Sequence, residues 1–232
     1  MENKIIVALD FNSSSQAVEF VDTLDPKLCR LKIGKELFTA AGPNLVETMI
    51  KKKFDVFLDL KFHDIPNTVA NAVKVAADLG VWMLNVHISG GSTMMKSAKD
   101  AIISHGGCKP ILIGVTVLTS ISSAELSEIG IKNDLKDQVV QLAKLAYQSG
   151  LDGVVCSAEE AKLLRNSMPA DFILVTPGIR REQDAAGDQK RVITPSQAIR
   201  NGSDYLVVGR PITQAASPSA ALAAFNSEIA SV

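Results

Sequence analysis

The sequence predicts a single (β/α)8 barrel. Three observations lead to this fold class. The chain has 232 residues, of which 47% are hydrophobic. Short apolar runs alternate along it with amphipathic stretches, and polar residues gather where those runs end. A chain of this length buries about 70–75% of its unfolded surface and is of ordinary size for one α/β barrel. We therefore expect one catalytic domain over residues 1–232.

The apolar runs predict eight strands. Short runs rich in β-branched and aliphatic residues, bounded by turn residues, are typical of strands that are buried on both faces. The predicted strands are residues 5–9, 30–34, 56–61, 83–88, 111–118, 153–156, 173–176 and 205–208.

The amphipathic stretches predict the helices between these strands. Strands that alternate with helical patterns of about 10–15 residues indicate βαβ units and a parallel sheet. Eight such units favour a closed barrel. The alternative is an open doubly wound sheet, but the Gly-x-Gly-x-x-Gly that often follows its first strand is absent here. The predicted helices are residues 14–24, 43–53, 69–79 after Pro66 in the first turn, 92–103, 135–148, 159–168, 195–201 and 218–229.

Charge and hydropathy limit the possible partners and location. The net charge is −1, with acidic and basic residues interspersed. The one basic run, Lys51 to Lys53, is expected to end a solvated helix, so nucleic acid is not an expected partner. The chain passes from Met1 into its first strand without a leader, and no apolar run reaches the roughly 18–20 residues that span a bilayer. We expect a cytoplasmic protein without a membrane partner.

The three cysteines indicate neither a disulfide framework nor a zinc site. Cys29, Cys108 and Cys156 lie far apart in the sequence, in or beside apolar segments. We expect reduced and mostly buried thiols.

The strongest chemical signal lies at the end of the third predicted strand, in residues 58–68. Alternation along a strand places Asp59 and Lys61 on the same face. Asp64 follows in the turn, where the backbone can fold it back towards Lys61. An isolated Asp-x-Lys is usually a structural ion pair. A lysine between two carboxylates, however, keeps its proton and is a well-placed acid, and such a cluster of charge is costly unless a function requires it.

Other polar residues follow neighbouring strands. In a barrel the carboxyl ends of all strands share one face, where active sites lie. Asp10 ends the first strand, and Lys32 is expected to point inward from the second. Thr119 and Ser120 follow the fifth strand, where the ordinary alternative is the N-cap of the next helix. His87 closes the fourth strand, but a lone histidine there is structural as often as catalytic, so we leave it out of the catalytic set.

The ends of strands seven and eight predict a phosphate site. Residues 176–180 (Thr-Pro-Gly-Ile-Arg) and 208–211 (Val-Gly-Arg-Pro) both place glycine near arginine. Loops at these positions of barrels frequently hold phosphate, because glycine lets a backbone amide approach the anion and arginine supplies a fork of donors. Residues 181–191 are polar and without periodicity. They are an ordinary surface loop or a lid that closes on the phosphate.

Together these motifs resemble the orotidine 5′-phosphate decarboxylase family over essentially the whole chain. The matching stretches are residues 7–10, 30–34, 59–68, 85–87, 115–120, 176–180, 187–189 and 208–210. The Asp-x-Lys-x-x-Asp spacing is shared by a wider superfamily, whereas residues 63–68 are similar to the decarboxylase itself. Metal-dependent relatives carry a carboxylate in strand two at the position of Lys32, which argues against a bound magnesium ion.

The resemblance implies a homodimer of barrels that converts orotidine 5′-phosphate to UMP and carbon dioxide in pyrimidine biosynthesis, without metal or organic cofactor. Loss of carbon dioxide leaves a carbanion at C6 that no adjacent carbonyl delocalises, and Lys61 can both stabilise and protonate it. Asp59 would crowd the substrate carboxylate, an effect whose weight is contested. The resemblance also implies that Asp10 and Lys32 bind the ribose hydroxyls, and that Asp64 and Thr68 reach the ribose from the neighbouring subunit. Thr119 or Ser120 would face the pyrimidine, and Pro177 would be a further substrate-binding residue. The phosphate would be bound by Arg180, Gly209, Arg210 and, on the lid, Gln189.

Two other functions are consistent with parts of the pattern. A different sugar-phosphate decarboxylase or aldolase of the same superfamily would need a divalent ion. A non-catalytic uridine-nucleotide binding protein would keep Arg210 and Gln189 but would have lost Lys61 or one aspartate of the array. The sequence keeps Asp59, Lys61 and Asp64.

Overall fold

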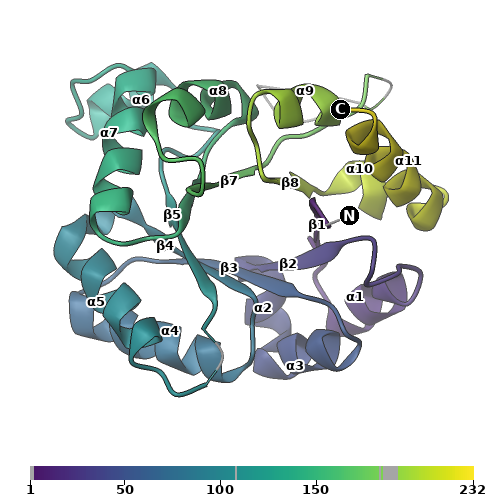
Figure 1. Cartoon of the computed structure of the whole chain (residues 1–232). Coiled ribbons are helices and arrows are strands. Elements are labelled where there is room, and N and C mark those ends of the chain that lie inside the picture. Colours follow the sequence, from purple (N-terminus) through teal and green to yellow (C-terminus); the bar gives the residue numbers. More distant parts are fainter. Residues whose placement is uncertain (1–2, 108, 183, 185–192) are drawn as a thin grey trace.

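A closed barrel of eight parallel strands, with helices around its outside, forms the fold (Figure 1). The computed structural model describes residues 3–107, 109–182, 184 and 193–232. The strands follow one another around the barrel in sequence order, and β1 pairs with β8 to close it. This closure confirms the predicted barrel and excludes the open sheet. The strands are β1 (Ile5–Ala8), β2 (Arg30–Gly34), β3 (Val56–Phe62), β4 (Met83–His87), β5 (Ile111–Val115), β6 (Gly153–Val155), β7 (Ile173–Thr176) and β8 (Tyr205–Val208).

The predicted strands are all present, but β5 is three residues shorter than predicted. It ends at Val115, and the side chain of Thr116 then donates a hydrogen bond to the carbonyl oxygen of Val155 on β6. Val117 and Leu118 line a cavity at the barrel mouth instead of continuing the strand. The sequence predicted a strand here because both residues are apolar, and apolar residues occur in cavity linings as well as in buried strands.

The structure contains every predicted helix, including the six-residue α9, but among the described residues it also contains four short elements that were not predicted. The unpredicted α2, α6 and α10 and the 3-10 turn η1 have three to seven residues each. Such elements span too few turns to show a hydrophobic period. The helices are α1 (Ser14–Val21), α2 (Lys35–Ala41), α3 (Pro43–Lys51), α4 (Pro66–Asp78), α5 (Gly91–Ile103), α6 (Ser123–Glu128), α7 (Leu135–Gln148), α8 (Ala158–Ser167), α9 (Pro195–Arg200), α10 (Arg210–Thr213) and α11 (Pro218–Ala230), with η1 at Ile88–Gly90.

Two apolar layers form the core because strand side chains alternate between the helices and the barrel interior. The larger layer lies between strands and helices and includes Leu31 and Ile33 of β2. The smaller layer fills the barrel and includes Ile6, Phe57 and Val175. Because Leu31 and Ile33 face the helices, Lys32 between them faces the interior, as predicted.

Aromatic rings around one arginine close the amino-terminal end of the barrel. The guanidinium of Arg30, at the start of β2, lies 4.3 Å from the ring centre of Trp82 and 5.0 Å from that of Tyr205. Its Nε donates to the carboxylate of Asp55 at 3.1 Å. Cation–π contacts of this kind favour a desolvated arginine. Large side chains, among them Trp82 and Tyr205, therefore fill the interior at this end.

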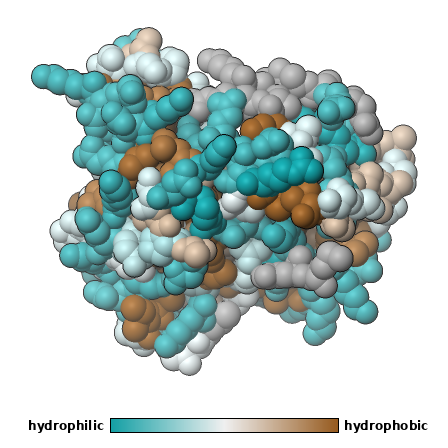
Figure 2. Space-filling view, turned by 45° about the horizontal axis from the view of Figure 1, so that its top comes forward, coloured by the Kyte–Doolittle hydropathy of each residue, from teal (hydrophilic) through white to brown (hydrophobic). Residues whose placement is uncertain are grey.

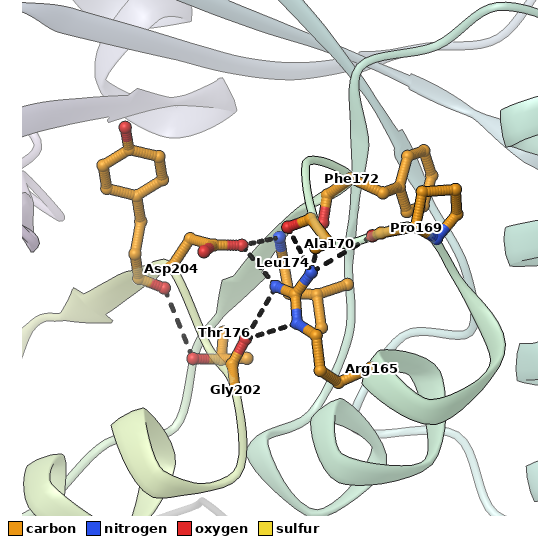
Figure 3. Close-up of polar contacts among 9 residues, drawn as sticks. Arg165, Pro169, Ala170, Phe172, Leu174, Thr176, Gly202 and Asp204 are labelled. Carbon is orange, nitrogen blue, oxygen red and sulfur yellow. Dashed lines mark hydrogen bonds and ion pairs between the residues drawn. The ribbon is translucent and has the colours of Figure 1, made fainter.

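A second arginine fixes the starts of β7 and β8 from the outside. Arg165 on α8 donates to the carboxylate of Asp204 at 2.7 Å and to the carbonyl oxygen of Gly202 at 2.8 Å (Figure 3). The same oxygen of Asp204 accepts from the backbone amide of Leu174 at 2.7 Å. The side chain of Asp204, just before β8, thus accepts the hydrogen bond of a β7 amide and also joins α8 to the sheet through Arg165.

The molecular face in Figure 2 shows hydrophobic residues in scattered patches among hydrophilic ones, over the part that the described residues form. Among the described residues, no helix has the length and apolar character needed to cross a membrane. As predicted, the basic run Lys51 to Lys53 lies at the end of a helix, because α3 ends at Lys51.

Candidate active site

Alternating charges from the first three strands meet at the carboxyl end of the barrel. The Nζ atom of Lys61 donates a 2.6 Å hydrogen bond to Oδ1 of Asp59. On the other side of that carboxylate, Nζ of Lys32 lies 3.3 Å from Oδ2 of Asp59. Lys32 also lies 3.6 Å from the carboxylate of Asp10, which follows β1. The order Asp10, Lys32, Asp59, Lys61 pairs every charge with an opposite one.

Asp59 lies at the centre of this row and is kept ionised by its neighbours. Burial by itself would raise the pKa of its carboxyl group. The ammonium groups of Lys32 and Lys61, with hydrogen bonds from Lys61 and Asn85, outweigh burial and lower the pKa below its ordinary value. The buried carboxylate therefore carries its charge throughout the neutral range and holds two ammonium groups at the barrel mouth.

A bulge in β3 brings Lys61 to its position. The pairing between β3 and β4 shifts between Leu58 and Phe62, and Lys61 has a φ of 52°. This left-handed conformation is uncommon for residues other than glycine, asparagine and aspartate. The prediction that Asp59 and Lys61 share one face is confirmed by their hydrogen bond, although the strand between them is irregular where a regular pleat was expected.

The turn after β3 does not fold Asp64 back on to Lys61 within the chain. Asp64 is exposed, and its carboxylate accepts from the backbone amide of Ile65 at 2.6 Å. Among the described residues, no hydrogen bond or ion pair joins Asp64 to Lys61. Pro66 begins α4, as predicted. Thr68 in the first turn of α4 is also exposed, so both side chains are accessible from outside this chain.

A cavity of about 190 Å³ adjoins the charged row. Lys32, Asp59 and Lys61 form one side of it. Thr119 lines the cavity, whereas Ser120 is exposed and is absent from the lining. Neither residue is a helix N-cap, because α6 is capped by Ser122. The rest of the lining is mainly apolar and consists of Phe57, Val115, Val117, Leu118, Val155, Cys156, Val175, Pro177 and Val207.

Two arginines meet beyond the cavity at the ends of β7 and β8. Arg180 is only 5% exposed, and it donates to the carbonyl oxygen of Ile179 at 2.8 Å. Burial, and next the positive charge of Arg210, lower the pKa of Arg180. Arg210 follows Gly209 and begins α10. Guanidinium groups that repel one another in a buried place are typical of an anion site, because the anion relieves the repulsion.

Of the other residues of the predicted phosphate site, some are described by the structure and some are not. Gly178 has a φ of 82°, which explains glycine at this turn, and Pro177 beside it lines the cavity. Gly187 and Gln189, and with them most of the predicted lid, lie outside the described residues.

His87 lies beside the charged row at the end of β4. Its ring centre is 5.6 Å from that of His63. Burial, and next the nearby charges of His63, Lys35 and Lys61, lower its pKa, which favours the neutral ring at neutral pH. No group of three or more histidine, cysteine, aspartate or glutamate side chains in the described part of the chain could hold a metal ion.

The described cysteines are free and buried, as predicted. Burial, and next the charge of Asp25, raise the pKa of Cys29 to about 12. Burial also raises the pKa of Cys156, which lines the cavity as a thiol. Cys108 lies outside the described residues.

The sequence prediction missed Asn85 and the apolar cavity wall. Asn85 is fully buried and donates a 2.6 Å hydrogen bond to Oδ1 of Asp59. Its signal in the sequence is a carboxamide in the middle of an apolar strand, where a polar group needs a partner. The cavity wall has no such signal, because its residues come from five different strands and loops.

Comparisons with known proteins show the family to which the chain belongs. Residues 3–225 match the family described as "Orotidine 5'-phosphate decarboxylase / HUMPS family". The chain is 56% identical over 232 residues to an orotidine 5'-phosphate decarboxylase of Actinobacillus succinogenes, covering 100% of both chains. It is 57% identical over 226 residues to one of Vibrio cholerae, covering 97% of this chain and 98% of the relative. The crystal structure of orotidine 5'-phosphate decarboxylase from Lactobacillus acidophilus shares 42% identity at a TM-score of 0.89, covering 98% of this chain and 99% of that one. The resemblance in the sequence motifs is confirmed: the chain belongs to the orotidine 5′-phosphate decarboxylase / HUMPS family.

Proposed function

We propose that this chain is a carboxy-lyase that converts orotidine 5′-phosphate to UMP and carbon dioxide in pyrimidine biosynthesis. The observation that carries this proposal is the hydrogen bond between Lys61 and the ionised Asp59 at the edge of a largely apolar cavity. At the edge of the cavity, the ammonium group of Lys61 can act both as a fixed positive charge and as a proton donor.

The reaction divides into bond cleavage and proton transfer. The bond from C6 to the carboxylate breaks, carbon dioxide leaves, and the electron pair stays on C6 in the plane of the pyrimidine ring. The ammonium of Lys61 stabilises this carbanion and then gives it a proton, so that UMP forms. The apolar wall of the cavity, which includes Val117 and Val207, supports this role, because an electrostatic interaction is stronger where water is excluded.

Asp59 and Lys32 prepare Lys61 for this step. The substrate carboxylate would lie beside Asp59, and the like charges would favour its departure as neutral carbon dioxide. Lys32 balances the second oxygen of Asp59 and, with Asp10, would bind the ribose hydroxyls. Thr119 lines the cavity and is therefore the better candidate than Ser120 for the pyrimidine.

The paired arginines support a phosphate site. Arg180 and Arg210, with Gly209, would bind the phosphate and Gln189 would cover it, while Pro177 lines the cavity between phosphate and base. Binding energy from this remote group can drive closure over the reacting carbon.

The exposed turn after β3 supports a shared site in a homodimer. Asp64 and Thr68 are exposed, and no hydrogen bond or ion pair among the described residues joins Asp64 to Lys61 of its own chain, so they would serve the ribose in the site of a neighbouring subunit. A two-fold axis would repeat the arrangement in both sites. We further propose that one barrel forms the whole catalytic domain, that the enzyme acts in the cytoplasm, and that it has no nucleic-acid or membrane partner.

Catalysis without metal or organic cofactor is part of the same proposal. Lys32 supports it, because its ammonium already balances the charge of Asp59 and Asp10, where a cation would otherwise be needed. The test is to follow pyrimidine absorbance with orotidine 5′-phosphate and purified protein in an excess of chelator. We expect sustained turnover with UMP as product. If turnover is absent in chelator and returns when a divalent ion is added, the result would instead favour a metal-dependent member of the superfamily.

A further inference from the structure

The ladder between β3 and β4 leaves one residue of β4 opposite three of β3. Leu58 pairs with Leu84 and Phe62 pairs with Val86, so residues 59–61 of β3 face only Asn85. A bulge of this kind leaves backbone groups without ladder partners, and a buried amide without a partner is costly. The amide of Lys61 is one such group, and Oδ1 of Asn85 accepts its hydrogen bond at 2.7 Å.

The other end of the same side chain holds the carboxylate. Nδ2 of Asn85 donates to Oδ1 of Asp59 at 2.6 Å, the oxygen that also accepts from Nζ of Lys61 at 2.6 Å. The backbone amide can only donate and the ionised carboxylate can only accept. A carboxamide, with an acceptor at one end and a donor at the other, satisfies both partners at once, whereas an alkyl group or an ionised carboxylate does not.

Lys61 needs such support because of its backbone. Its φ of 52° is in a region that persists in a residue with a long side chain only where the surroundings hold it. Asn85 is 0% exposed and does not line the cavity, so it can hold Lys61 without touching a bound substrate.

We propose that Asn85 is the positioning residue of this site: its oxygen holds the left-handed backbone of Lys61, and its amide orients the Asp59 carboxylate towards the Lys61 ammonium. This inference rests on the proposed function, because positioning matters only if Lys61 delivers the proton.

Asn85→Ala removes both contacts and separates positioning from binding. A displacement of about 1 Å at a reacting group can cost about 100-fold in rate. We therefore expect kcat to fall about 10- to 100-fold, while KM stays within about threefold because Asn85 does not line the cavity. The matched control is Asn226→Ala on α11, which removes an amide that donates to the carbonyl oxygens of Leu28 and Leu222 far from the charged row. We expect the control to keep the parent kcat and KM.

Asn85→Asp tests the amide end through pH. Its carboxylate still accepts from the Lys61 amide, but its second oxygen now faces Asp59. Two carboxyl groups this close share one proton, and the pKa of the pair is raised. The charged and titratable groups around Asp59 are Lys32 with Asp10 behind it, Lys61, and His87 on β4, and the substitution changes none of them.

At low pH the shared proton imitates the lost N–H, and as pH rises through the raised pKa the proton leaves and the carboxylates repel. The kcat of Asn85→Asp should therefore fall with rising pH across a range in which the parent does not lose activity. A merely structural role for Asn85 would not produce this new pH dependence.

Hydrogen exchange at the Lys61 amide can be measured in the parent protein as well as in both variants. We expect strong protection in the parent, retained in Asn85→Asp and lost by tenfold or more in Asn85→Ala. Turnover in the parent separates the two proposals, since a parent without turnover overturns the proposed function. An active parent with an unprotected Lys61 amide overturns the role of Asn85, as does an unchanged kcat in Asn85→Ala. If Asn85→Ala does not fold, the pH profile of Asn85→Asp and the exchange of the parent amide decide, and a profile that matches the parent overturns the inference.

Discussion

The ammonium of Lys61 lies 2.6 Å from Oδ1 of Asp59, at the rim of the barrel and within a break in the pairing of β3 with β4. The contact joins a proton donor to the carboxylate that a departing carboxyl group would face.

Lys61→Ala should abolish turnover and leave the fold and UMP binding largely intact. Loss of a general acid typically costs about 10²–10⁴ in rate, and here a stabilising charge is lost as well. Steady-state kinetics measure the first effect, and the rise in Tm on adding UMP measures the second. Lys99→Ala is the control, since it also removes a lysine at 2.6 Å from an aspartate, Asp152, outside the site. A Lys61→Ala variant within tenfold of the parent would remove Lys61 from the mechanism.

Arg210→Ala should reduce kcat as well as raise KM. Hydrogen bonds to charged groups contribute about 1.5–3 kcal/mol each, so we expect kcat/KM to fall by two or more powers of ten. Arg200→Ala, at the exposed end of α9, should leave both constants unchanged. If only KM rises in Arg210→Ala, the phosphate anchors the substrate without assisting the chemical step.

Lys61→Ala and Asp64→Ala homodimers should each be nearly inactive, and mixed dimers should regain activity. One site of a hybrid combines both substitutions, whereas the other has an intact Lys61 from one chain and an intact Asp64 from its partner. The two proteins are unfolded together and refolded, and mass spectrometry confirms the exchange. Activity near half of the parent per hybrid dimer is expected. Confirmed hybrids without activity would place Asp64 in its own chain's site.

Acid should remove the stabilisation that Asp59 provides. Because its pKa is lowered in the folded protein, this stabilisation is present above the ordinary value of 3.8 and is lost as pH falls through the lowered one. Asp59→Asn should therefore unfold more easily than the parent at pH 7, by about 1.5–3 kcal/mol, with a smaller difference below about pH 4. Urea unfolding from pH 3 to 7 measures this, with exposed Asp171→Asn as control. A difference that does not change with pH would show that the pKa is not lowered.

Arg165→Ala should destabilise the fold without a direct effect on the site. Its guanidinium lies between Asp204 and the carbonyl oxygens of Gly202, Ala170 and Phe172 (Figure 3). Because the pair is partly exposed, we expect a loss of about 2–3 kcal/mol in the free energy of unfolding, below the range for a fully buried pair. Lys162→Ala, exposed on the same helix, should stay within about 0.5 kcal/mol. Equal effects of the two variants would contradict this role of Arg165.

The sequence determined the order of strands and helices and most of the charged row. Buried parallel strands are short apolar runs, and amphipathic helices have a period, so both leave local patterns that do not depend on distant residues. Asp59 and Lys61 lie on one strand, so alternation was enough to predict that they share a face, although the structure reaches this arrangement through a bulge.

Only the tertiary structure decided what joins residues that are distant in the chain. The pairing of β1 with β8 closes the barrel. The position of Lys32 between Asp10 and Asp59 depends on the pairing of β1, β2 and β3, and the approach of Arg180 to Arg210 depends on the pairing of β7 with β8. The bulge at Lys61 depends on Asn85, 24 residues further along the chain. Strand periodicity predicts which side chains share a face, but the register between two strands is set by packing and hydrogen bonds across them, and no local pattern encodes it.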